Sequence, residues 1–88
     1  MDKRILTNEE TGGRPVTVYD FSDGDCFQSM NGRTVYKVKG DYTSLTEDDS
    51  FDCDIYISKN GTFELDRSGS INVQNFNLFF TFLGNNSI

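Results

Sequence analysis

The stretch GDYTSLTEDDSFDCDIYIS, residues 40–58, is the most distinctive part of this 88-residue chain. Its second half, residues 51–58, alternates between apolar and polar side chains, which is the pattern of a β-strand with one buried face. We predict that Phe51, Cys53, Ile55 and Ile57 point inward and that Asp52, Asp54, Tyr56 and Ser58 point outward.

Two Asn-Gly dipeptides predict hairpins on either side of residues 40–58. Asn60-Gly61 predicts a type I′ turn, because this turn needs positive φ at both central residues, which Asn and Gly adopt at least cost. It would lead into a strand at residues 62–66, with Phe63 and Leu65 inward, and then into a turn at residues 67–70. Asn31-Gly32 predicts the same kind of turn between strands at residues 26–30 and 33–39.

The N-terminal part adds further strands. Residues 16–21 are β-branched and aromatic, and the Asp23-Gly24 dipeptide ends this strand with a turn. With the two strands that follow it, this segment predicts an antiparallel meander. Residues 3–7 could form a short edge strand, and residues 1–15 as a whole could be a mobile segment.

Two segments have no clear period. Residues 41–50 are rich in Thr, Ser and Asp and predict a long connection that could hold one helical turn from Thr46. Residues 71–83 fit a bulged strand better than a helix, because asparagines, β-branched residues and phenylalanines are poor helix formers. Residues 84–88 are expected to be a polar tail.

The fold class that these elements predict is all-β. We expect a single domain of residues 1–88, in which a five- to six-stranded antiparallel meander closes into a small barrel or a two-layer sandwich, with at most one short helix. The two cysteines, Cys26 and Cys53, are expected to be free thiols in small buried side chains.

The charge of the chain is concentrated in one segment. Residues 40–58 contain six carboxylates and no Lys or Arg, whereas residues 1–39 carry six acids and six bases and residues 59–88 carry two of each. The formal net charge of -6 therefore belongs to these nineteen residues. A charge so segregated suggests a binding surface, although a solvated acidic face is the simpler alternative.

Enzymatic and metal-dependent functions have little support in the sequence. The chain has no histidine to activate a cysteine or serine, and its acids crowd a loop and an exposed strand face. We therefore expect no enzyme, no catalytic residue, no cofactor and no metal site. A weak calcium-binding domain is an alternative, because residues 20–25 and 47–49 offer carboxylates near turns, but their spacing does not match an EF-hand loop.

The function that we predict is a non-enzymatic acidic inhibitor. It would imitate DNA or RNA and occupy the basic surface of a nucleic-acid-handling protein, as virus-encoded proteins against restriction or CRISPR systems do. Outward side chains on one strand lie about 6.6–6.8 Å apart and could replace alternate phosphates. The partner-binding residues that we predict are Asp41, Tyr42, Glu47, Asp48, Asp49, Asp52, Asp54 and Tyr56.

The alternative from a different class is a structural protein that forms a homodimer. Aromatic residues at adjacent positions near the C-terminus would leave both faces of a strand apolar, and one face could meet a second copy. The interface residues of this alternative are Phe76, Leu78, Phe79, Phe80 and Phe82.

The remaining expectations concern the surroundings of the protein. Because the chain carries no basic cluster, direct binding to nucleic acid is not expected. No stretch is apolar enough to be a signal peptide or to span a bilayer, so we expect no membrane partner and a cytoplasmic protein, in the cytoplasm of the host cell if it is virus-encoded.

Overall fold

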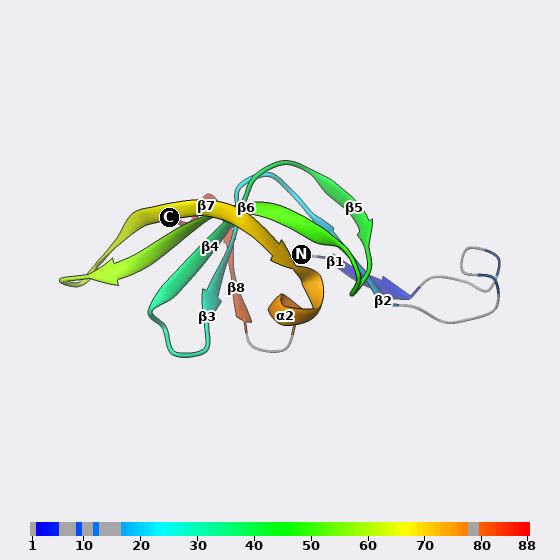
Figure 1. The fold of residues 1–88 in the computed structure, drawn as a ribbon, viewed down its shortest axis with the longest axis horizontal. Coiled ribbons are helices and arrows are strands. Elements are labelled where there is room, and N and C mark those ends of the chain that lie inside the picture. The colour runs from blue at the N-terminus through cyan, green and yellow to red at the C-terminus, as the bar shows by residue number, and fades with distance from the viewer. Residues whose placement is uncertain (1, 6–8, 10–11, 13–16, 78–79) are drawn as a thin grey trace.

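The computed structural model is an all-β protein of two packed antiparallel sheets (Figure 1). It describes residues 2–5, 9, 12, 17–77 and 80–88. Within these residues, one sheet has three strands in the order β1-β2-β5, and the other has five in the order β7-β6-β4-β3-β8. The strands are β1 (Asp2–Ile5), β2 (Thr17–Phe21), β3 (Asp25–Ser29), β4 (Thr34–Val38), β5 (Tyr42–Leu45), β6 (Ser50–Lys59), β7 (Thr62–Asn72) and β8 (Phe80–Asn85), and the short helix is α2 (Val73–Asn77).

The two-layer sandwich that the sequence predicted is confirmed, and the two sheets do not close into a barrel. The strand order is more complex than a meander, because the chain passes between the sheets three times, from β2 to β3, from β4 to β5 and from β5 to β6. It leaves β2 for β3 through a turn at Gly24, and it leaves β4 for β5 through Gly40. Both glycines have positive φ, at 90° and 102°, which other residues adopt only with strain.

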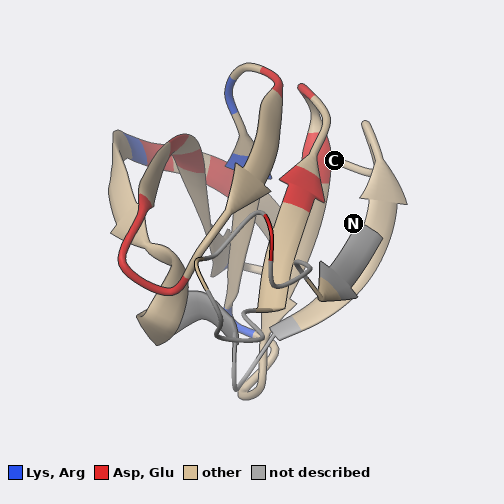
Figure 2. Ribbon diagram, turned by 90° about the vertical axis from the view of Figure 1, so that its right-hand side faces the viewer, with Lys and Arg blue, Asp and Glu red and all other residues tan. Residues whose placement is uncertain are grey.

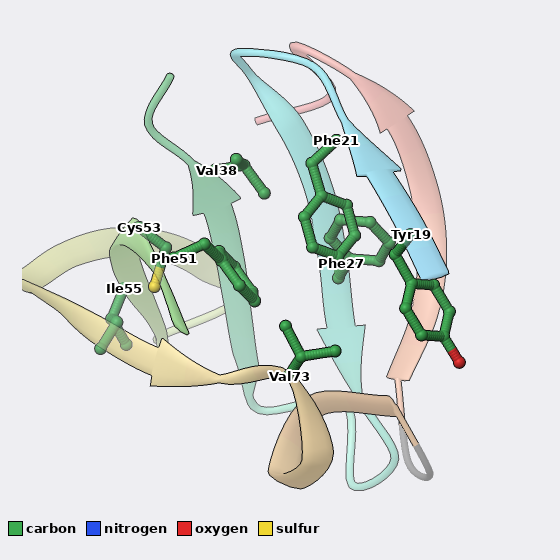
Figure 3. Packing of buried hydrophobic residues seen from close by; sticks show 8 residues of the cluster. All are labelled: Tyr19, Phe21, Phe27, Val38, Phe51, Cys53, Ile55 and Val73. Carbon is green, nitrogen blue, oxygen red and sulfur yellow. The ribbon is translucent and has the colours of Figure 1, made fainter. Parts of the chain in front are cut away.

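The core lies where the three-stranded sheet covers the five-stranded sheet (Figure 3). Phe21 of β2 is central to it. Its ring lies 4.7 Å from the ring of Phe51 and 5.6 Å from that of Phe27, the latter in an edge-to-face arrangement. Val73 of α2 closes the core from one end. Such aromatic pairs add about 0.5–1.5 kcal/mol each to the free energy that burial already contributes.

The alternation in residues 51–58 correctly predicted the buried face of β6. Phe51, Cys53 and Ile55 are buried in the core, and Ile57 is partly buried. The turn at Asn60-Gly61 is also confirmed, because both residues have positive φ, at 52° and 86°. β6 and β7 therefore form a long hairpin that closes between Lys59 and Thr62.

The hairpin predicted at Asn31-Gly32 is confirmed, because β3 and β4 pair antiparallel, but the predicted type I′ geometry of its turn was wrong. Gly32 has a φ of 72°, but Asn31 does not have positive φ. The turn instead forms one step earlier, where the Gly32 N–H donates to the carbonyl of Ser29 at 2.9 Å. The Asn31 side chain stabilises it by accepting hydrogen bonds from the Arg33 N–H and the Ser29 hydroxyl. A polar cap thus replaces the type I′ geometry.

Strand β7 departs from the prediction in two ways. Residues 67–70 do not turn but continue the strand, and Gly69 lies opposite Cys53. A register shift between Ile55 and Tyr56 leaves Asp66 as an extra residue, which is a β-bulge. The two-residue turn at Asn60-Gly61 places Leu65 opposite Tyr56 on the outer face, so Leu65 is 58% exposed instead of inward, and Phe63 shares that outer face.

Two further segments also differ from expectation. Residues 42–45, predicted to lie in a connection, form β5; its lack of alternation is explained by Ser44, whose φ is 58° and whose N–H donates to Asp20 at 2.8 Å. The run at residues 71–83 is not one strand, because residues 73–77 are helical and β8 begins at Phe80.

The predicted polar tail is partly a strand. β8 includes Gly84 and Asn85 and pairs with β3. The Asn85 amide donates to the Asp23 carbonyl and to the Asp25 carboxylate, and the Asn86 N–H donates to the Gly24 carbonyl. These hydrogen bonds hold residues 85–86 against the turn between β2 and β3.

Candidate binding surface

The acidic segment does not form one continuous row in the folded chain. It is divided into β5, a turn at residues 46–49 and the first part of β6. Each part places its carboxylates in a different environment, so the eight predicted partner-binding residues fall into separate groups.

The carboxylates of β6 lie beside basic residues of the neighbouring strand. Asp54 faces Lys37 in the register of β4 and β6, and the Lys39 ammonium lies 3.6 Å from the Asp54 carboxylate. The Ser68 hydroxyl of β7 also donates to Asp54. Asp52 is exposed, as predicted, and no ion pair of its side chain occurs among the described residues. The row of strand acids predicted as phosphate substitutes is therefore partly neutralised.

The turn at residues 46–49 contains one acid with a structural role and two exposed acids. The Asp49 carboxylate accepts hydrogen bonds from the Thr46 N–H at 2.7 Å and from the Thr46 hydroxyl at 3.2 Å. The Asp49 N–H donates a hydrogen bond to the Thr46 carbonyl. This ring of bonds fixes the turn without the predicted helical turn. Glu47 and Asp48, at its tip, are exposed to solvent.

Asp41 is linked by hydrogen bonds to the turn that contains Asp23, an acid that the sequence predicted only as a turn former. The Asp23 N–H donates to the Asp41 carboxylate at 2.9 Å, and the Gly40 N–H donates to the Asp23 carboxylate at 2.7 Å. Both aspartates remain exposed. Asp23 was missed as a surface acid because it lies eighteen residues before Asp41, and nothing in the sequence indicates that the two turns meet.

The two predicted tyrosine anchors have different surroundings. Tyr42 packs its ring 6.1 Å from that of Phe51, and its hydroxyl donates to the Lys39 carbonyl and accepts from the Asp52 N–H. Tyr42 therefore ties β5 to β6 and is not free to anchor a partner. Tyr56 is partly buried on the outer face of the large sheet, opposite Val35 on one side and Leu65 on the other.

We call the exposed carboxylates at residues 22–24, 39–41 and 46–52 the acidic rim. Within these ranges Lys39 is the single base. Figure 2 shows acidic segments on several separate turns and strands, with few basic segments among them. The members of the acidic rim are Asp23, Asp41, Glu47, Asp48 and Asp52.

A shallow open depression adjoins the acidic rim. It has a volume of about 470 Å³, and Asp52 belongs to both the depression and the rim. Its lining residues are Lys39, Asp52, Cys53, Ser68, Gly69 and Ser70.

Asp20 and Asp25 have structural roles, as is usual for acids near turns. Asp20 accepts from the Ser44 N–H, and Asp25, which is 5% exposed, accepts from the Ser22 N–H at 2.8 Å. Asp25 also accepts from the Asn85 side-chain amide at 3.1 Å, and the oxygens of Asp20 and Asp25 do not converge on one point. Among the residues that the structure describes, no group of three or more acids, cysteines or histidines could hold a metal ion.

Both cysteines are buried and free, as predicted. Burial, together with the nearby carboxylates of Asp54 and Asp52, raises the pKa of the Cys53 thiol from 9.0 to about 12. A thiol with this pKa is almost fully protonated at neutral pH, and the thiolate is the nucleophilic form. Cys53 is thus suited to packing in the core.

The described residues of the predicted oligomer interface are divided between α2 and β8. Leu78 and Phe79 lie outside the described residues. Phe76 belongs to α2 and Phe80 begins β8. Phe82 is 44% exposed, and one side of its ring lies 5.2 Å from the ring of Phe27.

Comparison with protein-family models, curated proteins and solved structures gave no match to this chain. In the described part of the chain, no helix has the length and apolar character needed to cross a membrane.

Proposed function

We propose that this protein is a non-enzymatic binding module whose acidic rim docks on a basic surface of a partner protein. The observation that carries the proposal is the rim itself: Asp23, Asp41, Glu47, Asp48 and Asp52 are all exposed, and Lys39 is the single base in the same ranges. Such a field steers a basic partner toward the rim during the encounter.

The chemistry of the rim favours a partner that handles nucleic acid. Proteins of this class carry grooves of Lys and Arg that bind a row of phosphates. The acidic rim would fill such a groove and exclude the nucleic acid, which is the action of an inhibitor that imitates DNA or RNA. Because Asp54 is paired with Lys39, the turns and Asp52 carry this imitation, and β6 does not contribute a full row. Such a partner would be met in the cytoplasm, that of a host cell if the chain is virus-encoded.

Charge reversal at the rim tests this proposal. Asp48→Lys combined with Asp52→Lys changes two exposed side chains without touching a described ion pair. The matched control is Glu9→Lys combined with Glu64→Lys, which changes the net charge by the same amount at exposed positions outside the rim. Each variant is used to capture proteins from a lysate of the source cell or its host.

The proposal predicts capture of one basic nucleic-acid-handling protein by the natural chain and by the control, with loss at about 0.5 M salt or when duplex DNA competes. The rim variant should bind that protein at least about tenfold more weakly, since like charges placed against each other cost several kcal/mol. Equal capture by the rim variant and the control would contradict the proposal.

A second candidate function is self-assembly through β8. This strand ends the five-stranded sheet, and its Phe82 and Leu83 side chains are 44% and 39% exposed. An edge strand with exposed apolar side chains can pair with a second copy.

A further inference from the structure

The other edge of the large sheet is formed by β7, which among the described residues pairs with β6 alone. At eleven residues it is the longest of the described strands. The hairpin that it forms with β6 projects away from the three-stranded sheet (Figure 1). β4 pairs with β6 from Cys53 to Ile57, so only the tip of the hairpin is two-stranded. A two-stranded segment is at best marginally stable in water, so it gains stability from a further strand.

The hairpin turn determines which backbone groups of β7 face its open edge. In a two-residue turn at Asn60-Gly61, Lys59 and Thr62 form the closing hydrogen-bonded pair. Hydrogen-bonded and non-hydrogen-bonded pairs then alternate along an antiparallel ladder. Glu64 therefore bonds inward to β6, whereas the N–H and carbonyl groups of Phe63 and Leu65 point to the open edge.

The bulge at Asp66 changes this alternation beyond Leu65. Arg67 lies opposite Ile55 and Gly69 opposite Cys53, which places both in hydrogen-bonded pairs with β6. The N–H and carbonyl groups of Ser68 and Ser70 consequently point to the open edge. Asn72, opposite Ser50, continues this alternation at the end of the strand. The four edge-facing residues closest to the bulge, Phe63, Leu65, Ser68 and Ser70, lie symmetrically about the bond between Asp66 and Arg67.

This symmetry makes β7 complementary to itself. We propose that β7 pairs with β7 of a second copy, antiparallel, about a two-fold axis between Asp66 and Arg67. Leu65 then forms a hydrogen-bonded pair with Ser68 of the partner subunit, and Phe63 does so with Ser70 of the partner subunit. Each of these four edge-facing residues meets another of them, and the two five-stranded sheets join into one.

The charges at the centre of β7 favour the same register. Asp66 and Arg67 contact each other and are partly exposed, with 33% and 66% of their side chains accessible. The two-fold places Asp66 beside Arg67 of the partner subunit, and Arg67 beside Asp66 of the partner subunit. A register shifted by one residue would place Asp66 against itself or Arg67 against itself. Charged residues and bulges usually block pairing at a sheet edge. Here the two-fold axis pairs opposite charges, so a closed dimer can form, whereas the addition of further copies is disfavoured.

Two charge-reversal variants, each measured alone and in a 1:1 mixture, test this dimer. Asp66→Arg gives a chain with two central arginines, and Arg67→Asp gives a chain with two central aspartates. Each variant alone repels its own copy at the two-fold, whereas a mixed pair is complementary. The interface is small, so we expect the natural chain to dimerise at roughly 0.1 mM, measured by sedimentation at low salt.

The result expected is a dimer for the natural chain, monomers for each variant alone and a mixed dimer in the 1:1 mixture. The contact between Asp66 and Arg67 within one chain is lost in both variants, so recovery in the mixture cannot come from that contact. A natural chain that remains monomeric at this concentration, or a mixture that remains monomeric, would overturn the proposal.

A backbone change and a change at the opposite edge complete the experiment. Ser70→Pro removes an N–H that faces the open edge, so the fold should survive, as checked by circular dichroism, and the dimer should be lost. Phe82→Ser, at the β8 edge, should leave the β7 dimer intact. Dissociation by Phe82→Ser with no effect of Ser70→Pro would contradict pairing through β7 and favour assembly through β8.

Discussion

The two ends of the large sheet differ in what covers them. At one end, β2, β5 and α2 bury the inner face of β6, so that Phe51 is 2% exposed and Cys53 is fully buried. At the other end, β6 and β7 form a projecting hairpin on which Leu65 is 58% exposed. Strand pairing is continuous from one end to the other. The comparison shows that backbone hydrogen bonds form along the whole hairpin, whereas burial, and with it most of the stability, belongs to the covered end.

The charges follow the same division. The acidic rim lies on the turns around the covered end, where the aromatic core fixes their positions. The hairpin end carries Asp66 and Arg67 as neighbours of opposite sign. A rigid scaffold that presents loops is the usual arrangement for binding, and an uncovered edge is the usual place for strand addition.

The largest expected effect comes from truncating a ring at the covered end. Phe51→Ala should lower the free energy of unfolding by about 3–5 kcal/mol, because it removes contacts with Phe21 and Tyr42 and leaves a cavity. Leu65→Ala, the matched change at the hairpin end, should alter it by no more than about 0.5 kcal/mol. Urea denaturation of both variants measures the difference, and similar losses would show that the two ends are not distinct.

A smaller effect is expected from pH, and it reports on the covered end alone. The pKa of Cys53 is raised to about 12 in the folded chain, from 9.0 when the thiol is exposed. The unfolded state therefore loses this proton first, so the contribution of Cys53 to stability is fully present below pH 9 and is lost as the pH rises from 9 to 12. Cys53→Ala should reduce this fall in the free energy of unfolding, and an unchanged pH profile would contradict the assignment to Cys53.

Local sequence patterns predicted those features of the fold that depend on residues close together in the sequence. The alternation at residues 51–57 predicted the buried positions of β6, and Asn60-Gly61 predicted its turn, because both signals act within a few residues. The same Asn-Gly signal failed at Asn31, where its side chain caps a different turn. Propensity alone could not separate these two outcomes.

Features that depend on strand register could not be predicted. The bulge at Asp66 sets the register of residues 67–72 against β6, and no residue type marks it in advance. The acidic segment contains no base, yet folding brings Lys39 to Asp54 from the neighbouring strand. Asp23 meets Asp41 through two turns that are distant in sequence. The acidic surface was therefore predicted in its residue type and approximate location, but its membership required the structure.

Amide hydrogen exchange in a dilute sample tests the difference between the two ends most directly. Within β6, residues 51–55 span the part that contributes to the core, and residues 57–59 lie outside the core cluster, next to the hairpin turn. We predict that the first group exchanges at least about a hundredfold more slowly, because its amides open only when the whole domain unfolds, whereas the hairpin opens locally. Equal protection along β6 would contradict this account and would show that the hairpin is as firmly held as the core.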